Sequence, residues 1–177
     1  LTPPRMRADI VTITHGHSDH NNTESLGGNP FVITGPGEYE VGGAYIHGIE
    51  TFHDTEQGAS RGLNTVYTIG VENLTIAHFG DFGEDGLRPE TADELGSIDI
   101  LMIPTGGTYT IDAKRAERIV KQLEPRFVIP MHYAVNSDVT SRVKGLSFKI
   151  DGVDSFLKEM GVGTVEPVEK FTIRKKD

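Results

Sequence analysis

Residues 14–20 read Thr-His-Gly-His-Ser-Asp-His, and four of these seven side chains are of types that bind first-row transition metals. They are His15, His17, Asp19 and His20. Three imidazoles and a carboxylate this close together would repel one another when charged, and would lack partners if they were simply buried. A bound divalent cation removes both problems, so the stretch predicts a metal site.

The residues before this stretch predict how it is held. Residues 9–14 are β-branched and apolar, which favours a buried strand that delivers the cluster at its C-terminal end. Since successive side chains of an extended chain alternate, His15 and His17 point the same way and can bind one ion. Asp19 and His20 lie beyond a turn and could face a second ion. A solvated polar loop is disfavoured, because three of the seven histidines of the chain fall here.

The composition restricts the ions and partners. The chain has no cysteine, which excludes a thiolate zinc site, a disulfide framework and a cysteine nucleophile. Imidazole and carboxylate ligands suit zinc, manganese or iron, and zinc is the expected ion. The 177 residues predict a single domain spanning residues 1–177. The net charge of −9 disfavours nonspecific nucleic-acid binding. No signal segment or membrane span is recognisable, which predicts a cytoplasmic protein without a membrane partner.

The middle of the chain predicts a β-meander that ends in another candidate ligand. Glycine-rich turns separate short strands at residues 31–34, 39–41 and 44–49. His53 follows the last strand and is a candidate metal ligand, whereas His47 lies within that strand and is expected to be structural or on the surface.

The loop after His53 holds three further charged side chains of interest. Asp54 or Glu56 could replace His53 as a ligand. Arg61 could meet an anionic substrate group near the metals, although an ion pair with one of these carboxylates is the favoured interpretation.

Residues 64–70 and 74–79 then predict a hairpin. Asp81 follows a glycine at the end of the second strand, where the backbone can turn sharply and direct the carboxylate inward to bridge two cations. His78 would face the other way in a regular strand, so we expect it to support the site or the fold rather than to bind a metal directly.

The second half of the chain predicts a βαβ unit preceded by a helix at residues 89–95. The unit comprises a strand at residues 98–104, a helix at residues 111–123 and a strand at residues 126–131. Parallel pairing of its strands would place His132 at a C-terminal strand end, beside the loop of residues 105–109. A weaker pattern follows, with strands at residues 147–150 and 168–173 around a helix at residues 153–160.

The order of these motifs resembles a known family. The motif His15-Gly16-His17-Ser18-Asp19-His20 is followed by His53 after a strand, by Gly80-Asp81 and by Pro130-Met131-His132-Tyr133. This order is similar to that of the metallo-β-lactamase superfamily, and within it to the uncharacterised metal-dependent hydrolases of the ascorbate-lactonase-like branch. The resemblance implies an α/β fold, a four-layer αββα sandwich. Family members usually begin with further strands, so we expect the N-terminal strands to be missing or incomplete. Because an unpaired sheet edge favours association, a homo-oligomer is an alternative state.

The resemblance also implies a hydrolase with two metal ions. One ion would be held by His15, His17 and His53, and the other by Asp19, His20 and His132. Asp81 would bridge the two ions, with a hydroxide between them as nucleophile, and Asp19 would also orient that nucleophile or carry a proton. Asp19 and Asp81 are therefore the expected catalytic residues. By analogy alone, the substrate is a phosphodiester, a lactone or another ester, because the fold hosts several reactions.

Two other function classes stay open at this point. The same ligands could hold two irons in a redox protein, although a histidine rather than a carboxylate at position 53 disfavours this. The chain could also be a non-catalytic module that a metal stabilises, in which case metal binding would raise the melting temperature without turnover.

Overall fold

The computed structural model describes residues 6–135 and 150–174. Six strands form one mixed sheet in the order β10-β9-β8-β7-β6-β5. They are β5 (Gly37–Val41), β6 (Ala44–Phe52), β7 (Leu63–Val71), β8 (Leu74–His78), β9 (Ile100–Pro104) and β10 (Phe127–Met131). Two small parallel sheets accompany it. They pair β1 (Met6–Arg7) with β3 (Leu26–Gly27), and β2 (Ile10–Ile13) with β4 (Phe31–Thr34).

Local sequence explains the connections of the large sheet. Strands β5 to β8 are antiparallel neighbours, and Glu72 and Asn73 join β7 to β8 with positive φ angles of 50° and 62°. Two such residues form the tight turn that matches the twist of a hairpin. Strands β8, β9 and β10 are parallel, so a helix must return the chain between β9 and β10. The predicted hairpin and βαβ unit are both confirmed.

The three described helices agree with the sequence pattern. Helix α1 (Pro89–Leu95) begins at a proline, which suits the first turn of a helix because no N–H is needed there. Helix α2 (Ala113–Leu123) begins after Asp112, whose side chain accepts the Arg115 N–H and so caps the helix. Helix α4 (Val153–Glu159) coincides with most of the helix predicted at residues 153–160.

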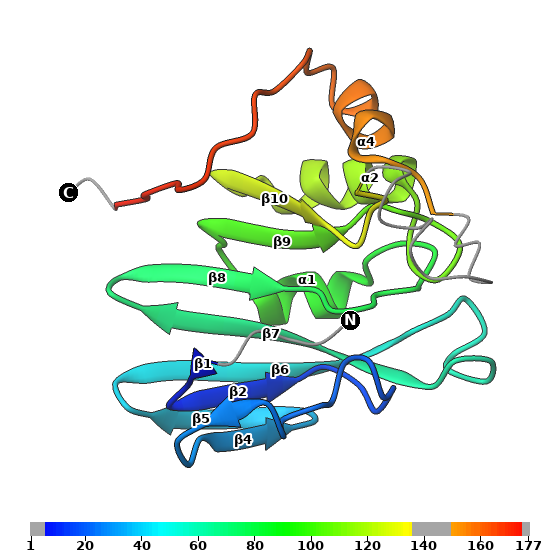
Figure 1. Cartoon of the computed structure of the whole chain (residues 1–177). Helices are drawn as coiled ribbons and strands as arrows, with labels where there is room; N and C mark the ends of the chain where they lie inside the picture. The colour runs from blue at the N-terminus through cyan, green and yellow to red at the C-terminus, as the bar shows by residue number, and fades with distance from the viewer. Residues whose placement is uncertain (1–5, 136–149, 175–177) are drawn as a thin grey trace.

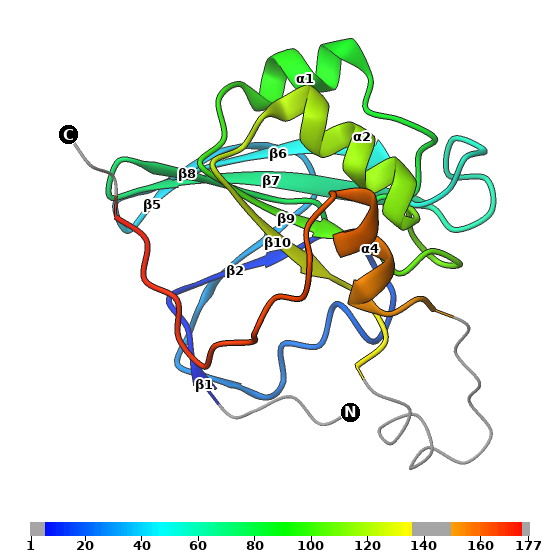
Figure 2. The ribbon, with the colours of Figure 1, turned by 90° about the horizontal axis from the view of Figure 1, so that it is seen from above.

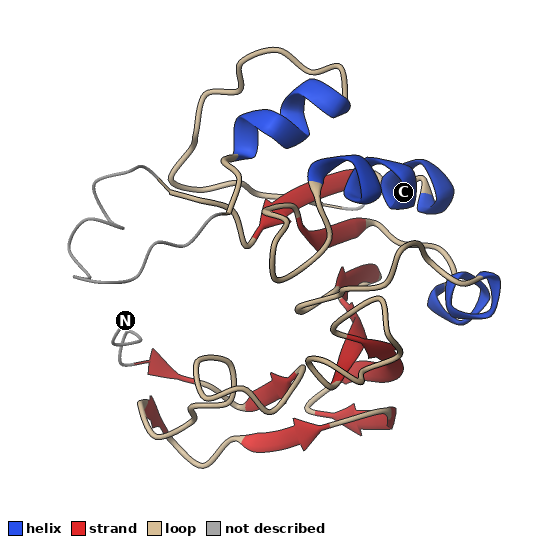
Figure 3. Ribbon diagram, turned by 90° about the vertical axis from the view of Figure 1, so that its right-hand side faces the viewer, coloured by secondary structure: helices blue, strands red, loops and turns tan. Residues whose placement is uncertain are grey.

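The elements stack in layers around the large sheet. Helices α1 and α2 cover one face of it, and β2 lies on the opposite face (Figure 2). Figure 3 shows the helices and the strand layers from the side. The main core packs the helices onto the sheet and includes Phe79, Leu101, Ile119 and Phe156. A second cluster, with Ile33, Ile46 and Tyr67, joins the β2–β4 pair to the large sheet.

The direction of the strands creates one functional edge. Pairing makes β6, β8, β9 and β10 run the same way, and all four end on the right in Figure 1. The end of β2 joins them, because the Thr14 carbonyl after it accepts the Thr65 N–H at 2.7 Å. Segments far apart in sequence therefore meet at this edge.

Two strand predictions need correction, and part of a third predicted strand lies outside the described residues. Strand β4 is not part of the meander, because the chain leaves it through Gly35 and Gly37, whose φ angles of 92° and 142° turn it into the other sheet. Residues 168–173 form no strand. Residues 147–149 of the other predicted strand lie outside the described residues. Among the described residues, no helix is long and apolar enough to span a membrane.

Candidate metal centre

A cavity of about 420 Å³ lies at the edge where the strands end. Its lining residues come from six separate segments of the chain. They are His17, Asp19, His20, His53, Arg61, Asp81, Tyr109, His132 and Ile150. Six of the seven ligands predicted from the sequence are in this lining, and His15 lies directly behind it against Asp81.

Asp81 lies at the centre of the cluster. Its Oδ2 is 3.3 Å from Nε2 of His53 and 3.8 Å from Nε2 of His15. The Nε2 atoms of His20 and His132 are 3.7 and 3.6 Å from the same oxygen. Four imidazoles from three separate segments thus direct the same nitrogen at one carboxylate oxygen.

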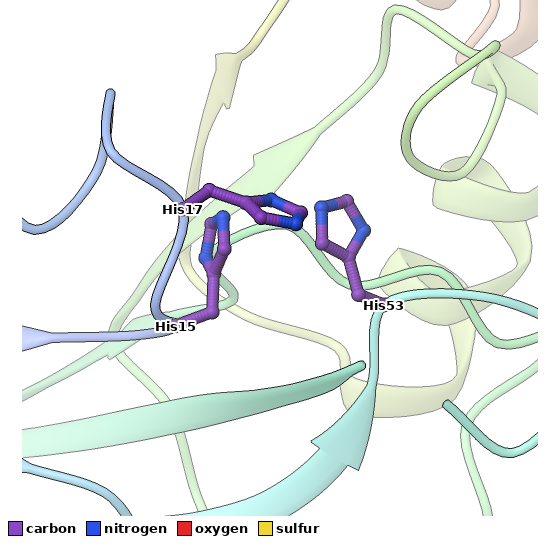
Figure 4. Close-up of side chains that lie close together, drawn as sticks. All are labelled: His15, His17 and His53. Carbon is purple, nitrogen blue, oxygen red and sulfur yellow. The ribbon is translucent and has the colours of Figure 1, made fainter. Parts of the chain in front are cut away.

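The first of the two predicted ligand sets is present as a group. His15, His17 and His53 point their rings toward one another (Figure 4), and each offers a nitrogen within 4.8 Å of the others. Two nitrogens bound to one zinc ion at about 2.1 Å can be at most about 4.2 Å apart. Small side-chain rotations therefore suffice to bring the three nitrogens onto one ion.

The second predicted set, of Asp19, His20 and His132, stays a prediction. A further group of potential ligand atoms within 4.8 Å comprises His15, His20 and Asp81. Asp19 is at the rim, with a side chain 78% exposed and Oδ2 3.6 Å from Nε2 of His20. His132 follows β10, with Nε2 3.6 Å from Oδ2 of Asp81, and holds a φ angle of +51°, which is unusual outside glycine.

The donor atoms fit a metal of the zinc type. Nε2 of His15 is buried and has no hydrogen-bond partner among the described residues. Its Nδ1 lies 3.0 Å from the Thr14 hydroxyl, which leaves Nε2 as the free ligand atom. Metal-binding histidines are held this way, with the second ring nitrogen fixed by a hydrogen bond. A buried imidazole nitrogen without a partner is costly unless something binds it.

The electrostatics favour the metal-binding protonation states. Burial lowers the pKa of His15 to about 4, although Asp81 opposes this, so the ring is neutral at pH 7. Burial alone would raise the pKa of Asp81, but the hydrogen bond from His53 and the surrounding imidazoles bring it to about 2. Neutral imidazole and ionised carboxylate are the forms that bind metals.

Asn64, which sequence reasoning missed, fixes the turn that carries Asp81. It is fully buried, and its Oδ1 accepts the Asp81 N–H at 3.0 Å. Its Nδ2 donates to the Phe79 carbonyl and to the Thr51 hydroxyl, both at 2.9 Å. The only signal in the sequence was an amide side chain at the start of a predicted strand, which is too common to be informative.

Close backbone approaches at three glycines bring the ligand segments together. A Cβ at Gly83 would lie 2.3 Å from the His53 carbonyl, and one at Gly106 would lie 2.1 Å from the His132 carbonyl. A Cβ at Gly80 would lie 2.4 Å from Oδ1 of Asn64, and Gly80 also has a φ of +56°. A larger residue at Gly83 or Gly106 would displace the backbone of a candidate ligand, and one at Gly80 would displace Asn64 or Thr14.

The loop after His53 resolves one alternative from the sequence, that of Asp54 as a ligand. The Asp54 carboxylate accepts four backbone N–H groups of its own loop, from Glu56, Gly58, Ser60 and Arg61. Burial would raise the pKa of Asp54, but these donors hold it below its usual value. Asp54 therefore orders the loop and is not directed at the metal cluster.

Neither His78 nor His47 belongs to the two groups of potential ligand atoms. His78 accepts the Gly80 N–H at 3.1 Å, and burial lowers its pKa. His47 lines a different cavity, on β5 and β6. Tyr109, by contrast, lines the metal cavity.

Comparisons with known proteins agree with this geometry. The family model of the beta-lactamase superfamily domain matches residues 1–132. A relative from Thermococcus onnurineus, named a metal-dependent hydrolase, is 32% identical, and the match covers 74% of this chain and 69% of the relative. A Thermotoga maritima crystal structure assigned to the Zn-dependent hydrolases of the metallo-beta-lactamase superfamily is 39% identical, with a TM-score of 0.71. That match covers 88% of this chain and 70% of the other.

A more distant structure shows the same fold. Igni18, a metallo hydrolase from Ignicoccus hospitalis, is 22% identical with a TM-score of 0.67, over 95% of this chain and 80% of its own.

Proposed function

The chain belongs to the metallo-β-lactamase superfamily and is a metal-dependent hydrolase, and from that premise we propose that it holds two metal ions around Asp81. The observation that carries the proposal is the convergence of four Nε2 atoms on Oδ2 of Asp81, between 3.3 and 3.8 Å. One ion would be bound by His15, His17 and His53. The second would be bound by Asp19, His20 and His132, with Asp81 shared.

The metals would supply a nucleophile by lowering the pKa of a coordinated water towards about 7. Residues of this chain would orient that water and accept its proton. Asp81 is ionised and has four imidazoles around one carboxylate oxygen, so its carboxylate could be shared between the two ions. Asp19 is exposed at the rim next to His20, where its carboxylate can accept a proton and pass it to solvent.

We propose zinc as the ion, with manganese or iron as alternatives, and a small ester, lactone or phosphodiester as the substrate. The cavity of about 420 Å³ is within the range that holds a small molecule. The acidic charge of the chain disfavours nucleic acid as a substrate. A single domain, a cytoplasmic location and a homo-oligomeric state stay predictions from the sequence.

Metal content tests the proposal directly. We expect about two zinc or manganese ions per chain by elemental analysis of protein purified without added metal and without a histidine tag. Chelation should abolish hydrolysis of a p-nitrophenyl ester and phosphodiester panel, and zinc should restore it. One ion per chain would contradict the dinuclear site, and no ion with no uptake on reconstitution would contradict the whole proposal.

The two other function classes give different results in the same experiment. Two irons with oxygen consumption would favour the redox protein. Metal that raises the melting temperature without hydrolysis of any probe would favour a non-catalytic module.

A further inference from the structure

We infer that Arg61 binds an anionic group of the substrate, a phosphate or a carboxylate, beside the candidate metal centre. The inference rests on the proposed hydrolase and adds the class of molecule that it acts on. Arg61 lines the same cavity as His17, His53 and Asp81, so its side chain faces the space that a substrate would occupy.

The Arg61 side chain is held in place by Tyr109. Its NH1 donates to the Tyr109 carbonyl at 2.9 Å, and the guanidinium carbon lies 5.4 Å from the centre of the Tyr109 ring. At the other end, the Arg61 backbone N–H donates to the Asp54 carboxylate at 2.6 Å. The guanidinium is therefore already ordered, which reduces the entropy lost when it binds a partner.

Arg61 has no carboxylate partner within residues 6–135 and 150–174, although the sequence favoured an ion pair with Asp54 or Glu56. Three other arginines do have one. Arg88 pairs with Glu84, Arg115 with Asp85 and Asp112, and Arg126 with Asp99. The charge of Arg61 is thus available to a ligand, at a site where bound metal ions would add further positive charge.

The chemistry of the guanidinium defines the ligand. An arginine has five N–H donors in a planar fork, and Tyr109 uses one of them. The remaining donors match two oxygens of a phosphate or a carboxylate. The wall next to Arg61 is formed by the Tyr109 ring and Ile150, which suits an apolar portion of the same molecule.

Three probes with the same p-nitrophenolate leaving group distinguish the sources of the anion. They are p-nitrophenyl acetate, the p-nitrophenyl half-ester of glutaric acid and bis(p-nitrophenyl) phosphate. We expect Arg61→Ala to lower kcat/KM by about ten- to hundredfold on one or both anionic probes, the usual effect of losing a hydrogen bond to a charged group. Hydrolysis of the neutral acetate should stay within about twofold.

A loss confined to the half-ester would identify a carboxylate, and a loss confined to the diester a phosphate. Arg61→Lys should recover part of the loss, since it keeps the charge. Arg118→Ala is the matched control, because Arg118 lies on α2 and its side chain donates to the Asp85 carbonyl, outside the cavity. An equal loss on all three probes would overturn the inference and would indicate that Arg61 only holds the Tyr109 loop.

Binding provides a readout that does not need turnover. Calorimetric titration of the zinc-loaded protein with phenylphosphonate and with benzoate should give at least a tenfold weaker Kd in Arg61→Ala for one of them. Metal content and melting temperature should equal those of the wild type. Unchanged Kd values for both anions would overturn the inference, whereas hydrolysis absent from the wild type with a Kd that depends on Arg61 would contradict only the proposed function.

Discussion

The candidate metal centre has an inner wall and a rim that differ in how they are built. The inner wall comprises His15, His53 and Asp81, which are 7%, 2% and 5% exposed. The rim comprises His17, Asp19 and His20, all of which are exposed. The two parts provide similar chemical groups, but they obtain their geometry from different interactions.

Contacts between distant segments position the inner wall. The Thr14 carbonyl next to His15 accepts the Thr65 N–H, and the Gly83 N–H donates to the Phe52 carbonyl next to His53 at 2.9 Å. Asn64 holds the turn that carries Asp81. These bonds form when the sheet forms, so the inner wall is expected to be in place before any metal binds.

Local bonds position the rim. The His20 and Asn21 N–H groups both donate to the His17 carbonyl, at 2.9 and 3.1 Å, which closes a single turn. The Asn21 side chain also donates to the Gly16 carbonyl, at 3.0 Å. Few buried contacts support this turn, so we expect metal binding to order the rim more than the inner wall.

Removing the carboxylate of the inner wall should have the largest effect. Asp81→Ala is expected to lose close to one metal equivalent and to lower turnover by more than about a hundredfold, since even residues that only support a ligand contribute about 10- to 100-fold. Elemental analysis and steady-state kinetics measure both quantities. His47→Ala is the control and should change neither, because His47 lies in another cavity. Full activity in Asp81→Ala would contradict the assignment.

Disturbing the backbone of the inner wall should reduce stability. Gly80→Ala places a Cβ 2.4 Å from Oδ1 of Asn64 in a left-handed conformation, so we expect a loss of at least about 2 kcal/mol in the free energy of unfolding. Denaturant unfolding of the metal-free protein measures it. At Gly86 a Cβ would meet nothing within 4 Å, and Gly86→Ala should stay within about 0.5 kcal/mol. Equal effects of the two substitutions would mean that the close approach at Gly80 is unimportant.

A change at the rim should affect metal binding without affecting folding. Asp19→Ala removes an exposed carboxylate, so the unfolding free energy of the metal-free protein should change by less than about 0.5 kcal/mol. One of the two metal ions should be lost at lower chelator concentration than in the wild type, and kcat should fall. A strongly destabilised metal-free Asp19→Ala would show that the rim is as integrated as the inner wall.

The smallest expected effect concerns Glu84, which supports the inner wall from behind by accepting the Phe52 N–H at 3.1 Å. Burial raises the pKa of Glu84 above its ordinary value of 4.5, with Phe52 and Arg88 opposing. The folded state therefore binds the Glu84 proton more tightly than the unfolded state does. The contribution of this proton to the free energy of unfolding is fully present below pH 4.5. This contribution is lost as the pH rises through the pKa of Glu84 in the folded state.

The substitution Glu84→Gln, which removes the titrating group, tests the direction of this pH dependence. The unfolding free energy of the wild type relative to Glu84→Gln should fall as pH rises from 4 to 7, by less than about 1 kcal/mol because the partner Arg88 is 44% exposed. Urea unfolding at several pH values measures the difference. A difference that grows with pH would mean that the ion pair with Arg88 outweighs burial.

Much of the fold was predictable because its signals are local. The β-branched run before His15, the proline at the start of α1 and the cap at Asp112 act over a few residues. A strand or helix formed at each, although β2 is half-buried rather than buried. The errors lie where pairing partners are distant. Strand β4 was predicted to belong to the meander because no local pattern in residues 31–34 indicates which sheet they join.

The sequence alone determined the chemistry of the centre: histidine and aspartate ligands without cysteine, in motifs that resemble one superfamily. Only the tertiary structure decided which donors share a centre, that Asp54 orders its own loop and that Arg61 faces the cavity. Residue type fixes what a side chain can bind, and spacing along the chain fixes only its near neighbours. Distances between β2, β6, β8 and β10 arise from sheet pairing and from the approaches that Gly80, Gly83 and Gly106 permit.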